Sequence, residues 1–426
     1  MSNNLKPEDK IKLIRNIAIV AHVDHGKTTL VESILFAAGA IRRKGTVKDG
    51  NTVGDSSPEA RARSMSVEIN IASAEYLGED WTFIDCPGSI ELAQDALNVI
   101  AIADIAVLVV EPGAEKAIAA TRAMKELDRA GLPYILFINK MDGIEARVKA
   151  TLEALQGLTE RPLVLREIPI REGDDVTGHV DLVSERAYKW SGSGKSDLIE
   201  VPGELSGRTG EERTLLLETL ADFNDELLEQ LLEDVMPGTE DVYQNLGKDL
   251  QDGAIVPVFF GSAENESGIM RLMKALRHEA PEVAQTADRQ GIEPEGDVLA
   301  QAFKIYNGAT SGKLTFVRFW RGEFTDGGSL NGSRVSGIFK MMGLAQNKIS
   351  SARAGDVVAL GRVEDVKAGD ALSASIGAEA APWPERITPV YALSIHAGNR
   401  DDEVKMATAM AKIIEEDTSL VYGPNP

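Results

Sequence analysis

Short apolar runs separated by helix-like stretches constrain the fold of this chain more than any other feature. Strand-like runs occupy residues 16–21 (NIAIVA), 81–85, 105–110 and 133–139, and residues 28–40 have a helical pattern. Apolar runs of this length, separated by helices, are typical of a mostly parallel, doubly wound sheet. Such sheets bind their ligands at the carboxyl ends of the strands. We therefore expect an α/β domain whose functional residues directly follow these strands.

The residues after the first strand predict a phosphate-binding loop. The stretch AHVDHGKTT, residues 21–29, lies between a strand and a helix. Backbone N–H groups and the positive end of a helix hold phosphate oxygens in such a loop, while Lys27 reaches the outer phosphates and the Thr28 hydroxyl ligates Mg²⁺. Ala21 replaces the usual first glycine, so a chance match at a helix start is the alternative for this stretch alone. The predicted nucleotide-binding residues are His22, Val23, Asp24, His25, Gly26, Lys27, Thr28 and Thr29.

A second stretch, NKMD at residues 139–142, predicts recognition of guanine. Asp142 can accept hydrogen bonds from N1–H and the N2 amino group of guanine, whereas adenine would place a lone pair against this carboxylate. The stretch GSAE, residues 261–264, follows another strand and can close the base pocket through its backbone, although a simple turn has the same composition. An ATP-driven enzyme would need an adenine-compatible pocket, and Asp142 argues against it. The predicted base-binding residues are Asn139, Lys140, Asp142, Ser262 and Ala263.

A third stretch, DCPG at residues 85–88, lies between these two along the chain. Asp85 can hold Mg²⁺ through water, and the N–H of Gly88 can meet a γ-phosphate. Taken alone the stretch would be an ordinary proline-glycine turn, and its place between the other motifs supports the functional interpretation. Cys86 is the only cysteine, which excludes an internal disulfide, and we expect it to pack as a small buried residue.

Charge and hydropathy limit the partners of this chain. The formal net charge of -22 opposes non-specific attachment to nucleic acid or to an anionic membrane, so any RNA contact must be local. The sequence has no uncharged apolar stretch of about 18 residues, and its polar N-terminal segment does not resemble a signal peptide. We expect a cytoplasmic protein that does not bind a membrane or a specific DNA sequence.

The pattern along the chain predicts several parts. Residues 1–286 form the nucleotide-binding domain, with a subdomain of mixed strands and acidic helices inserted at about 158–252. Residues 287–297, rich in proline, glycine and acid, read as a linker. Alternating short strands and glycine turns at 298–385 predict a small β-barrel. Residues 386–426 pair one strand with one helix, which is too little to bury a core of its own, and indicate a domain that is cut short.

With these motifs in this order, the chain resembles the translational GTPases, and specifically the elongation factor G family. Residues 47–66 resemble the first switch of that family, residues 171–190 its inserted subdomain, and residues 303–327 its second, β-barrel domain. The resemblance implies an α/β P-loop GTPase domain with an inserted α+β subdomain, a β-barrel and the start of a small α+β domain. It also implies binding of GTP and GDP with Mg²⁺, and a ribosome as partner. Because family members continue through further domains, we expect a fragment that does not support translocation alone.

The first switch departs from the family pattern. The family has an arginine-glycine-isoleucine-threonine string whose threonine binds Mg²⁺, and the aligned residues here are Arg63, Ser64, Met65 and Ser66. Ser66 keeps the hydroxyl group. We therefore predict a Mg²⁺ site made by Thr28, Ser66 and Asp85.

The second switch departs at Ser89, where the family has a histidine that positions the attacking water. Positioning is most of what catalysis of phosphoryl transfer can offer, so an uncompensated loss should cost about 10²- to 10⁴-fold in rate. We predict Gly88 and Ser89 at the catalytic position and keep two hypotheses. In one, the chain is a ribosome-stimulated GTPase; in the other, it is a guanine-nucleotide-binding switch without effective hydrolysis. They differ in whether Ser89→His raises turnover.

Overall fold

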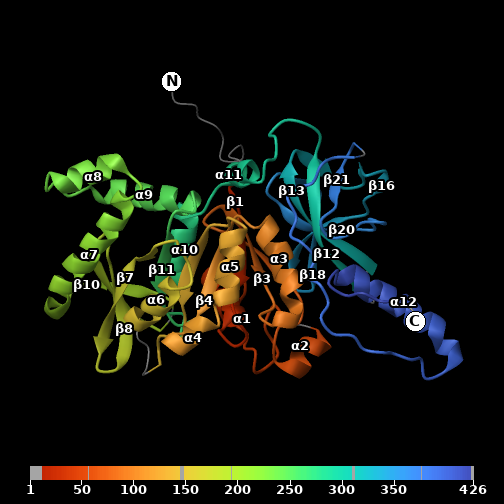
Figure 1. Cartoon of the computed structure of the whole chain (residues 1–426), viewed down its shortest axis with the longest axis horizontal. Helices are drawn as coiled ribbons and strands as arrows, with labels where there is room; N and C mark the ends of the chain where they lie inside the picture. The colour runs from red at the N-terminus through yellow and green to blue at the C-terminus, as the bar shows by residue number, and fades with distance from the viewer. Residues whose placement is uncertain are drawn as a thin grey trace.

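The computed structural model of this chain describes residues 12–55, 57–143, 148–192, 194–308, 312–375 and 377–423. Figure 1 shows a central α/β layer with the inserted subdomain on one side and the strand-rich C-terminal part on the other. Within these residues, no helix is long and apolar enough to span a membrane.

The central sheet is mostly parallel, and β1 lies inside it between β3 and β4. The order β3-β1-β4-β5-β11-β6 is parallel throughout, and β2 adds an antiparallel strand beside β3. This confirms the predicted fold class. The strands are β1 (Ile14–Val20), β2 (Asn70–Tyr76), β3 (Glu79–Asp85), β4 (Ile105–Val110), β5 (Tyr134–Ile138), β6 (Leu163–Leu165) and β11 (Val256–Phe260), and the helices around them are α1 (Lys27–Ala37), α2 (Pro58–Arg63), η2 (Ile90–Leu92), α3 (Ala93–Ile102), α4 (Ala114–Ile118), α5 (Thr121–Arg129), α6 (Val148–Gln156) and α10 (Ile269–Glu279).

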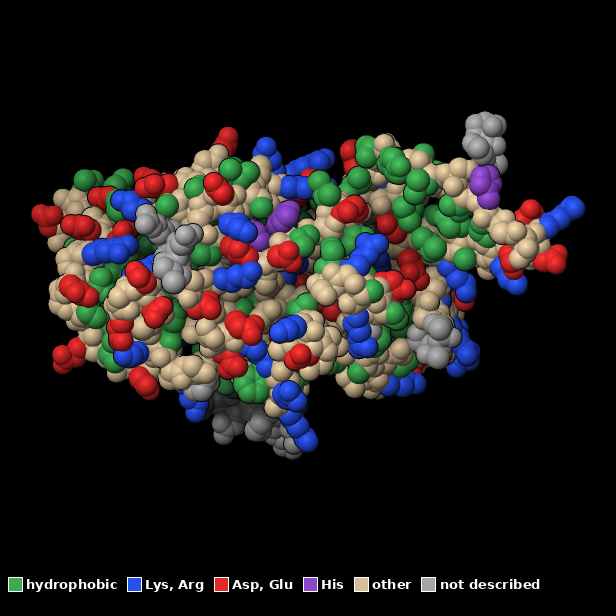
Figure 2. All heavy atoms as spheres, turned by 90° about the horizontal axis from the view of Figure 1, so that it is seen from below, with side chains coloured by type: hydrophobic (Ala, Val, Ile, Leu, Met, Phe, Trp, Pro, Cys, Tyr) green, Lys and Arg blue, Asp and Glu red, His purple; other side chains and the backbone are tan. Residues whose placement is uncertain are grey.

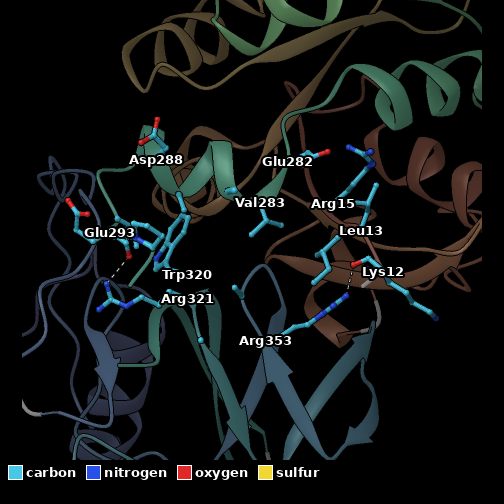
Figure 3. Close-up of a pocket in the computed structure, with 17 residues that line it drawn as sticks. Lys12, Leu13, Arg15, Glu282, Val283, Asp288, Glu293, Trp320, Arg321 and Arg353 are labelled. Carbon is cyan, nitrogen blue, oxygen red and sulfur yellow. Dashed lines mark hydrogen bonds between the residues drawn. The ribbon is translucent and has the colours of Figure 1, made fainter. Parts of the chain in front are cut away.

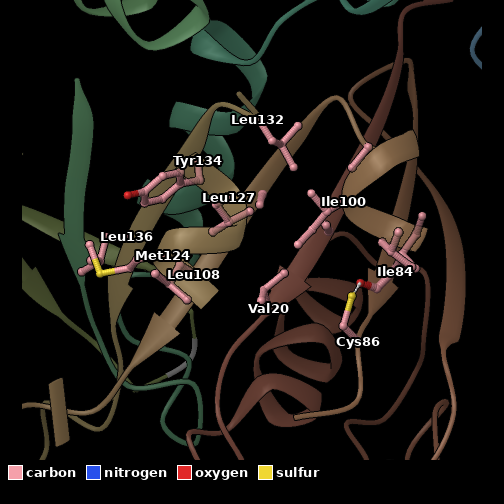
Figure 4. Packing of buried hydrophobic residues seen from close by; sticks show 14 of the residues in the cluster. Val20, Ile84, Cys86, Ile100, Leu108, Met124, Leu127, Leu132, Tyr134 and Leu136 are labelled. Carbon is pink, nitrogen blue, oxygen red and sulfur yellow. Dashed lines mark hydrogen bonds between the residues drawn. The ribbon is translucent and has the colours of Figure 1, made fainter. Parts of the chain in front are cut away.

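Both faces of this sheet are buried, because consecutive side chains of a strand point to opposite sides. Ala18 and Val20 of β1 join a core that includes α3 and α5, and Figure 4 shows part of it, with Val20, Ile84 and Cys86 close together. Ile17 and Ile19 join a second core that includes α1 and α10. Helices on both faces leave only the ends of the strands open to a ligand.

The inserted subdomain has its own sheet and helices. Its strands are β7 (Glu167–Glu172), β8 (Asp175–Asp181), β9 (Arg186–Trp190) and β10 (Ser196–Ile199), all antiparallel, and its helices are η3 (Gly203–Leu205), α7 (Ser206–Ala221), α8 (Asp225–Leu232) and α9 (Thr239–Gln251). Buried ion pairs join it to α10. Arg166 donates to both carboxylate oxygens of Glu279, at 2.6 and 3.1 Å, and Arg271 lies 2.6 Å from Asp181. Separating the partners of such a pair would leave an unpaired buried charge. The pairs therefore favour one orientation of the subdomain against α10.

The strand-rich part continues the central sheet. Its strands are β12 (Leu299–Gly308), β13 (Gly312–Arg321), β14 (Glu323–Thr325), β15 (Ser329–Leu330), β16 (Ser333–Arg334), β17 (Ile338–Met342), β18 (Ala345–Ile349), β19 (Ser351–Arg353), β20 (Val357–Gly361) and β21 (Ala371–Ser373). Met342 of β17 pairs with Ala72 of β2, and the Gly343 N–H donates to the Ile71 carbonyl at 2.9 Å. The buried guanidinium of Arg318 lies 2.6 Å from Asp104 of the nucleotide-binding domain. The sequence did not predict this continuity.

The helix α11 (Val283–Arg289) precedes the predicted linker and ends inside it, so residues 287–289 of the segment 287–297 are helical. The Glu282 side chain accepts from the backbone of the first turn while Gln285 bonds back to the Glu282 N–H, which is a capping box. Thr286 is buried. The limits of the linker, 287–297, stay a prediction.

The predicted strand near the C-terminal end was also wrong. Residues 386–398 form no strand, although η4 (Arg400–Asp402) and α12 (Glu403–Glu416) follow them. Val390 is 98% exposed and Tyr391 is 80% exposed. A strand is stable only when its backbone pairs with a neighbour, and no described strand lies beside this segment.

Asp249, near the end of α9, tests how burial of a carboxyl group changes the stability of the fold. Its side chain is buried, its Oδ2 has no hydrogen-bond partner, and burial raises its pKa from 3.8 to about 6. A carboxyl whose pKa is higher in the folded state contributes stability at low pH that is lost as the pH rises through 6. We expect Asp249→Asn to raise the free energy of unfolding by about 1–2 kcal/mol at pH 8, and by less at pH 5.

Urea unfolding at both pH values measures this effect. Asp252→Asn, which removes an exposed carboxylate at the same helix end, should change stability by no more than about 0.5 kcal/mol. Equal stabilisation by both variants would contradict the burial argument.

Candidate nucleotide-binding site

The predicted phosphate loop lies between β1 and α1, at the carboxyl end of the central strand. Gly26 has φ +85°, and a Cβ at this position would lie 2.5 Å from Nδ2 of Asn139. The loop therefore requires glycine here, both for its conformation and for the close approach of the base-binding stretch. The Lys27 side chain is buried, and its Nζ donates to the His22 carbonyl at 3.1 Å. This places the lysine inside the curve of the loop.

Oxygen atoms from three distant segments meet beside this lysine. The Thr28 hydroxyl donates to Oδ2 of Asp85 at 2.7 Å and lies 3.2 Å from the Ser66 hydroxyl. Oδ1 of Asp85 is buried and has no hydrogen-bond partner, and the same holds for Oδ2 of Asp55. Unsatisfied buried carboxylate oxygens next to hydroxyls are the kind of hard donor set that suits Mg²⁺.

Sequence reasoning missed Asp55. It lies in the segment before α2, has φ 48°, and lines the same cavity as Lys27 and Ser66. Nδ2 of Asn70 donates to its Oδ1 at 3.2 Å, which turns the carboxylate inward. An acidic residue in an irregular segment carries no periodicity, so only its position in the resemblance to the first switch could have indicated a role.

The charges of the site depend on one another. Burial raises the pKa of Asp85 to about 7, and Lys27 opposes this rise. Burial also lowers the pKa of Lys27, and Asp85 and Asp55 oppose that change. The neighbouring carboxylates thus stabilise the charged form of Lys27.

The base-binding stretches meet the phosphate loop through Asn139. Its Nδ2 donates to the His25 carbonyl at 3.0 Å, and its Oδ1 accepts from the Ala263 N–H at 2.9 Å. One amide therefore joins the loops that follow β1, β5 and β11. The exposed Asp142 accepts from Nδ2 of Asn265 at 3.2 Å, next to the same loop.

The cavity between these loops has a volume of about 210 Å³. Lys140 lines it and donates to the Asp24 carbonyl at 2.7 Å. Gly88 also lines it, and a Cβ on Gly88 would collide with Nζ of Lys27. The predicted residues that line the cavity are Val23, Asp24, Gly26, Lys27, Thr28, Thr29, Ser66, Gly88 and Lys140.

Other predicted residues lie around this cavity rather than on its wall. His22 is exposed, while His25 is buried with Nδ1 3.3 Å from the Val109 carbonyl. Ser262 is buried, and its N–H donates to the Ser267 carbonyl at 3.0 Å. Ser89 is half-buried at the start of η2, and the described residues that line the cavity do not include it.

A larger cavity, of about 650 Å³, lies away from this site, between β1, α11 and the strand-rich part (Figure 3). Its floor includes Leu13 and Val283. Two of the arginines that line it bond to backbone carbonyls, because Arg353 donates to the Lys12 carbonyl and Arg321 to the Glu293 carbonyl. This cavity contains none of the predicted nucleotide-binding residues and marks a junction between parts of the chain.

The contact between Gly26 and Asn139 makes a sharp test. We expect Gly26→Ala to lower the affinity for GDP at least about tenfold, because the new Cβ displaces the Asn139 amide and strains the loop. Titration with a fluorescent GDP analogue measures this affinity. Gly39→Ala is the matched control, since Gly39 also has positive φ but nothing lies within 4 Å of its Cβ position. Unchanged GDP affinity in Gly26→Ala would contradict the assignment.

Known proteins with similar sequences carry translation-factor names. A family model described as the elongation factor Tu GTP binding domain matches residues 12–282. An elongation factor G-like protein of Synechocystis sp. is 40% identical over 414 residues, which cover 97% of this chain and 62% of that protein. Proteins named elongation factor G 2 of Pseudoalteromonas translucida and Syntrophus aciditrophicus are 28% and 27% identical, over 95% and 98% of this chain and 62% and 64% of their own lengths.

A solved structure agrees with these sequence matches. The crystal structure of a protein from Thermus thermophilus superposes with a TM-score of 0.86 at 28% identity, and the match covers 96% of this chain and 62% of that one. This chain thus spans less than two thirds of the length of the relatives that it matches. The family match covers the domain that carries the site described above. The chain therefore belongs to the elongation factor G family of translational GTPases.

Proposed function

We propose that this chain binds GTP and GDP with Mg²⁺ at the site between β1, β3 and β5, and hydrolyses GTP in connection with the ribosome. The observation that carries the proposal is the meeting of Thr28, Ser66 and Asp85 beside Lys27. These residues come from the phosphate loop, the first switch and the end of β3. Guanine-nucleotide binding is the property that the matched family domain implies.

Each group has a distinct task in this proposal. The loop N–H groups and the N-terminal end of α1 hold phosphate oxygens, and Lys27 neutralises charge on the outer phosphates. Thr28 and Ser66 would ligate Mg²⁺ directly, while Asp85 and Asp55 would hold it through water. When bound, the ion neutralises charge that develops on the transferred phosphoryl group. The N–H of Gly88 orients the γ-phosphate.

On the base side, specificity comes from Asp142, which accepts from N1–H and the N2 amino group of guanine. Lys140 lies along the base, and the backbone of Ser262 and Ala263 closes the pocket. The contacts of Asn139 support this arrangement, because they hold the loops together before any base arrives. Such preorganisation lowers the entropy cost of binding.

Ser89 decides between the two hypotheses for hydrolysis. The intact phosphate and Mg²⁺ groups favour a working GTPase in which water or a group on the ribosome replaces the missing histidine. Ser89 follows Gly88 of the cavity wall but is not among the described lining residues, which favours the alternative, a guanine-nucleotide-binding switch without effective hydrolysis. Both hypotheses place the nucleotide in the same site. They differ only in whether some group positions the water that attacks the γ-phosphate.

The test of hydrolysis compares the unaltered chain with Ser89→His, with and without purified ribosomes. We expect ribosomes to stimulate GTP turnover of the unaltered chain and Ser89→His to change it little. Lys27→Ala, the control, should abolish nucleotide binding. If the unaltered chain binds GTP without stimulation and Ser89→His raises turnover by about 10²- to 10⁴-fold, the alternative holds instead.

The test of the metal assignment uses Asp55. We expect Asp55→Asn to raise the Mg²⁺ concentration needed for half-maximal GTP binding about tenfold, because the substitution removes a carboxylate charge from the site. Titration of Mg²⁺ against bound fluorescent nucleotide measures this concentration. Asp49→Asn, an exposed residue in the same segment, is the control. An equal shift in both variants would argue for a general electrostatic effect.

The partner and the location follow from family membership in this proposal. Acidic and basic side chains are interspersed over the face drawn in Figure 2, and the net charge is -22, so contact with ribosomal RNA has to be local. We propose a cytoplasmic location and no binding to a membrane or to a specific DNA sequence. The limits 1–286, 298–385 and 386–426 of the parts, and the insertion at about 158–252, stay predictions.

A further inference from the structure

Lys44 lies in the loop that follows α1, directly before the first switch, and its side chain reaches across to the base-binding loop. Its Nζ donates to the Ala263 carbonyl at 3.0 Å and to the Glu264 carbonyl at 2.6 Å, and it lies 3.9 Å from Oε1 of Glu266. The Lys44 side chain is only 14% exposed. Hydrogen bonds from a charged donor that is shielded from water are stronger than those of an exposed lysine.

The helix α1 also contacts the Ala263 carbonyl that Lys44 holds. Oγ of Ser33 lies 2.5 Å from the Ala263 carbonyl oxygen and 2.9 Å from the Thr29 carbonyl oxygen, so its single O–H can donate to the Ala263 carbonyl that Lys44 also contacts. The preceding residue, Glu32, is buried and accepts from the N–H groups of Gly45 and Val53, at 2.8 and 2.5 Å. One turn of α1 therefore holds both the base-binding loop and the beginning of the first switch.

The base-binding loop needs such support because it consists of small polar residues. Residues 261–267 read GSAENES: Ala263 joins a hydrophobic core, Ser262 and Ser267 exchange backbone hydrogen bonds, and polar contacts hold the rest of the loop. A peptide unit is planar, so fixing the carbonyl oxygens of Ala263 and Glu264 fixes the planes of two consecutive peptide groups. The N–H of Ala263 belongs to the preceding peptide group and donates to Oδ1 of Asn139 at 2.9 Å, on the base side of the loop, so Lys44 and Asn139 hold neighbouring peptide groups of the same loop. Ordering these groups in advance lowers the entropy that a bound base must overcome.

We propose that Lys44, which lies just before the first switch, is a positioning residue of the guanine pocket and holds the 261–267 loop in shape. The inference rests on the proposed binding of guanine nucleotides at this site and assigns a residue that does not itself contact the nucleotide. Lys44 precedes Gly45, and Glu32 accepts from the N–H groups of both Gly45 and Val53, which lies in the first switch, so the order of the first switch and the order of the base pocket are coupled. By reciprocity, a nucleotide that orders one of them favours order in the other.

The experiment compares Lys44→Met with Lys44→Arg and with Arg43→Met. Arg43 is the exposed neighbour of Lys44, so Arg43→Met removes the same charge from the same loop. We expect GDP to dissociate about tenfold faster from Lys44→Met, measured by chasing a fluorescent GDP analogue, and at the unaltered rate from Arg43→Met. Lys44→Arg keeps donors that reach the two carbonyls and should restore most of the slow dissociation.

A second readout does not depend on nucleotide. We expect amide hydrogen exchange in nucleotide-free Lys44→Met to quicken at residues 261–267 and to stay unchanged in the buried strand β4, with an unaltered midpoint of thermal unfolding. Exchange and dissociation that match Arg43→Met would overturn the role of Lys44. Failure of the unaltered chain to bind GDP, with faster exchange in Lys44→Met, would instead overturn the proposed function and leave the loop contact standing.

Discussion

The amide of Asn139 is the contact on which the arrangement of the nucleotide site depends. It donates to the loop after β1 and accepts from the loop after β11, while its own backbone continues β5. A parallel sheet brings the carboxyl ends of these strands to one edge, but it leaves the loops free to differ in height and direction. A single planar group with a donor and an acceptor removes this freedom, because both bonds form only when the two loops lie at one distance.

Around that centre, buried charge pairs fix the larger parts to the nucleotide-binding domain. Arg166 with Glu279 and Arg271 with Asp181 join the inserted subdomain to α10. Arg318 with Asp104 joins the strand-rich part to the loop before β4, and Asp104 also accepts from the N–H of Asn16 in β1. Such pairs need good geometry to offset the cost of removing charge from water, so they favour one relative orientation of the parts over neighbouring ones.

The sequence predicted the buried strands of the central sheet reliably. The run IAVLVV coincides with β4, because a strand buried on both faces is apolar throughout. Prediction failed where structure depended on a partner that sequence does not reveal. A local capping box at Glu282 starts α11, and the helix continues to residue 289, into the segment 287–297 that was predicted to be a linker. The apolar residues near Val390 form no strand, since no described strand lies beside them.

The sequence by itself determined the chemistry of the site and the order of its parts. Residue type and position after a strand are enough to predict roles for the glycine, lysine, threonine and aspartate of the phosphate site. The same holds for the NKMD stretch. Tertiary structure alone decided how these groups meet. It brought Asp55, Ser66 and Thr28 to one cavity, left Ser89 out of the described residues that line it, and set Lys44 against the base-binding loop. The reason is physical: residue type fixes which bonds a side chain can make, whereas the packing of helices and strands fixes which partners come within reach.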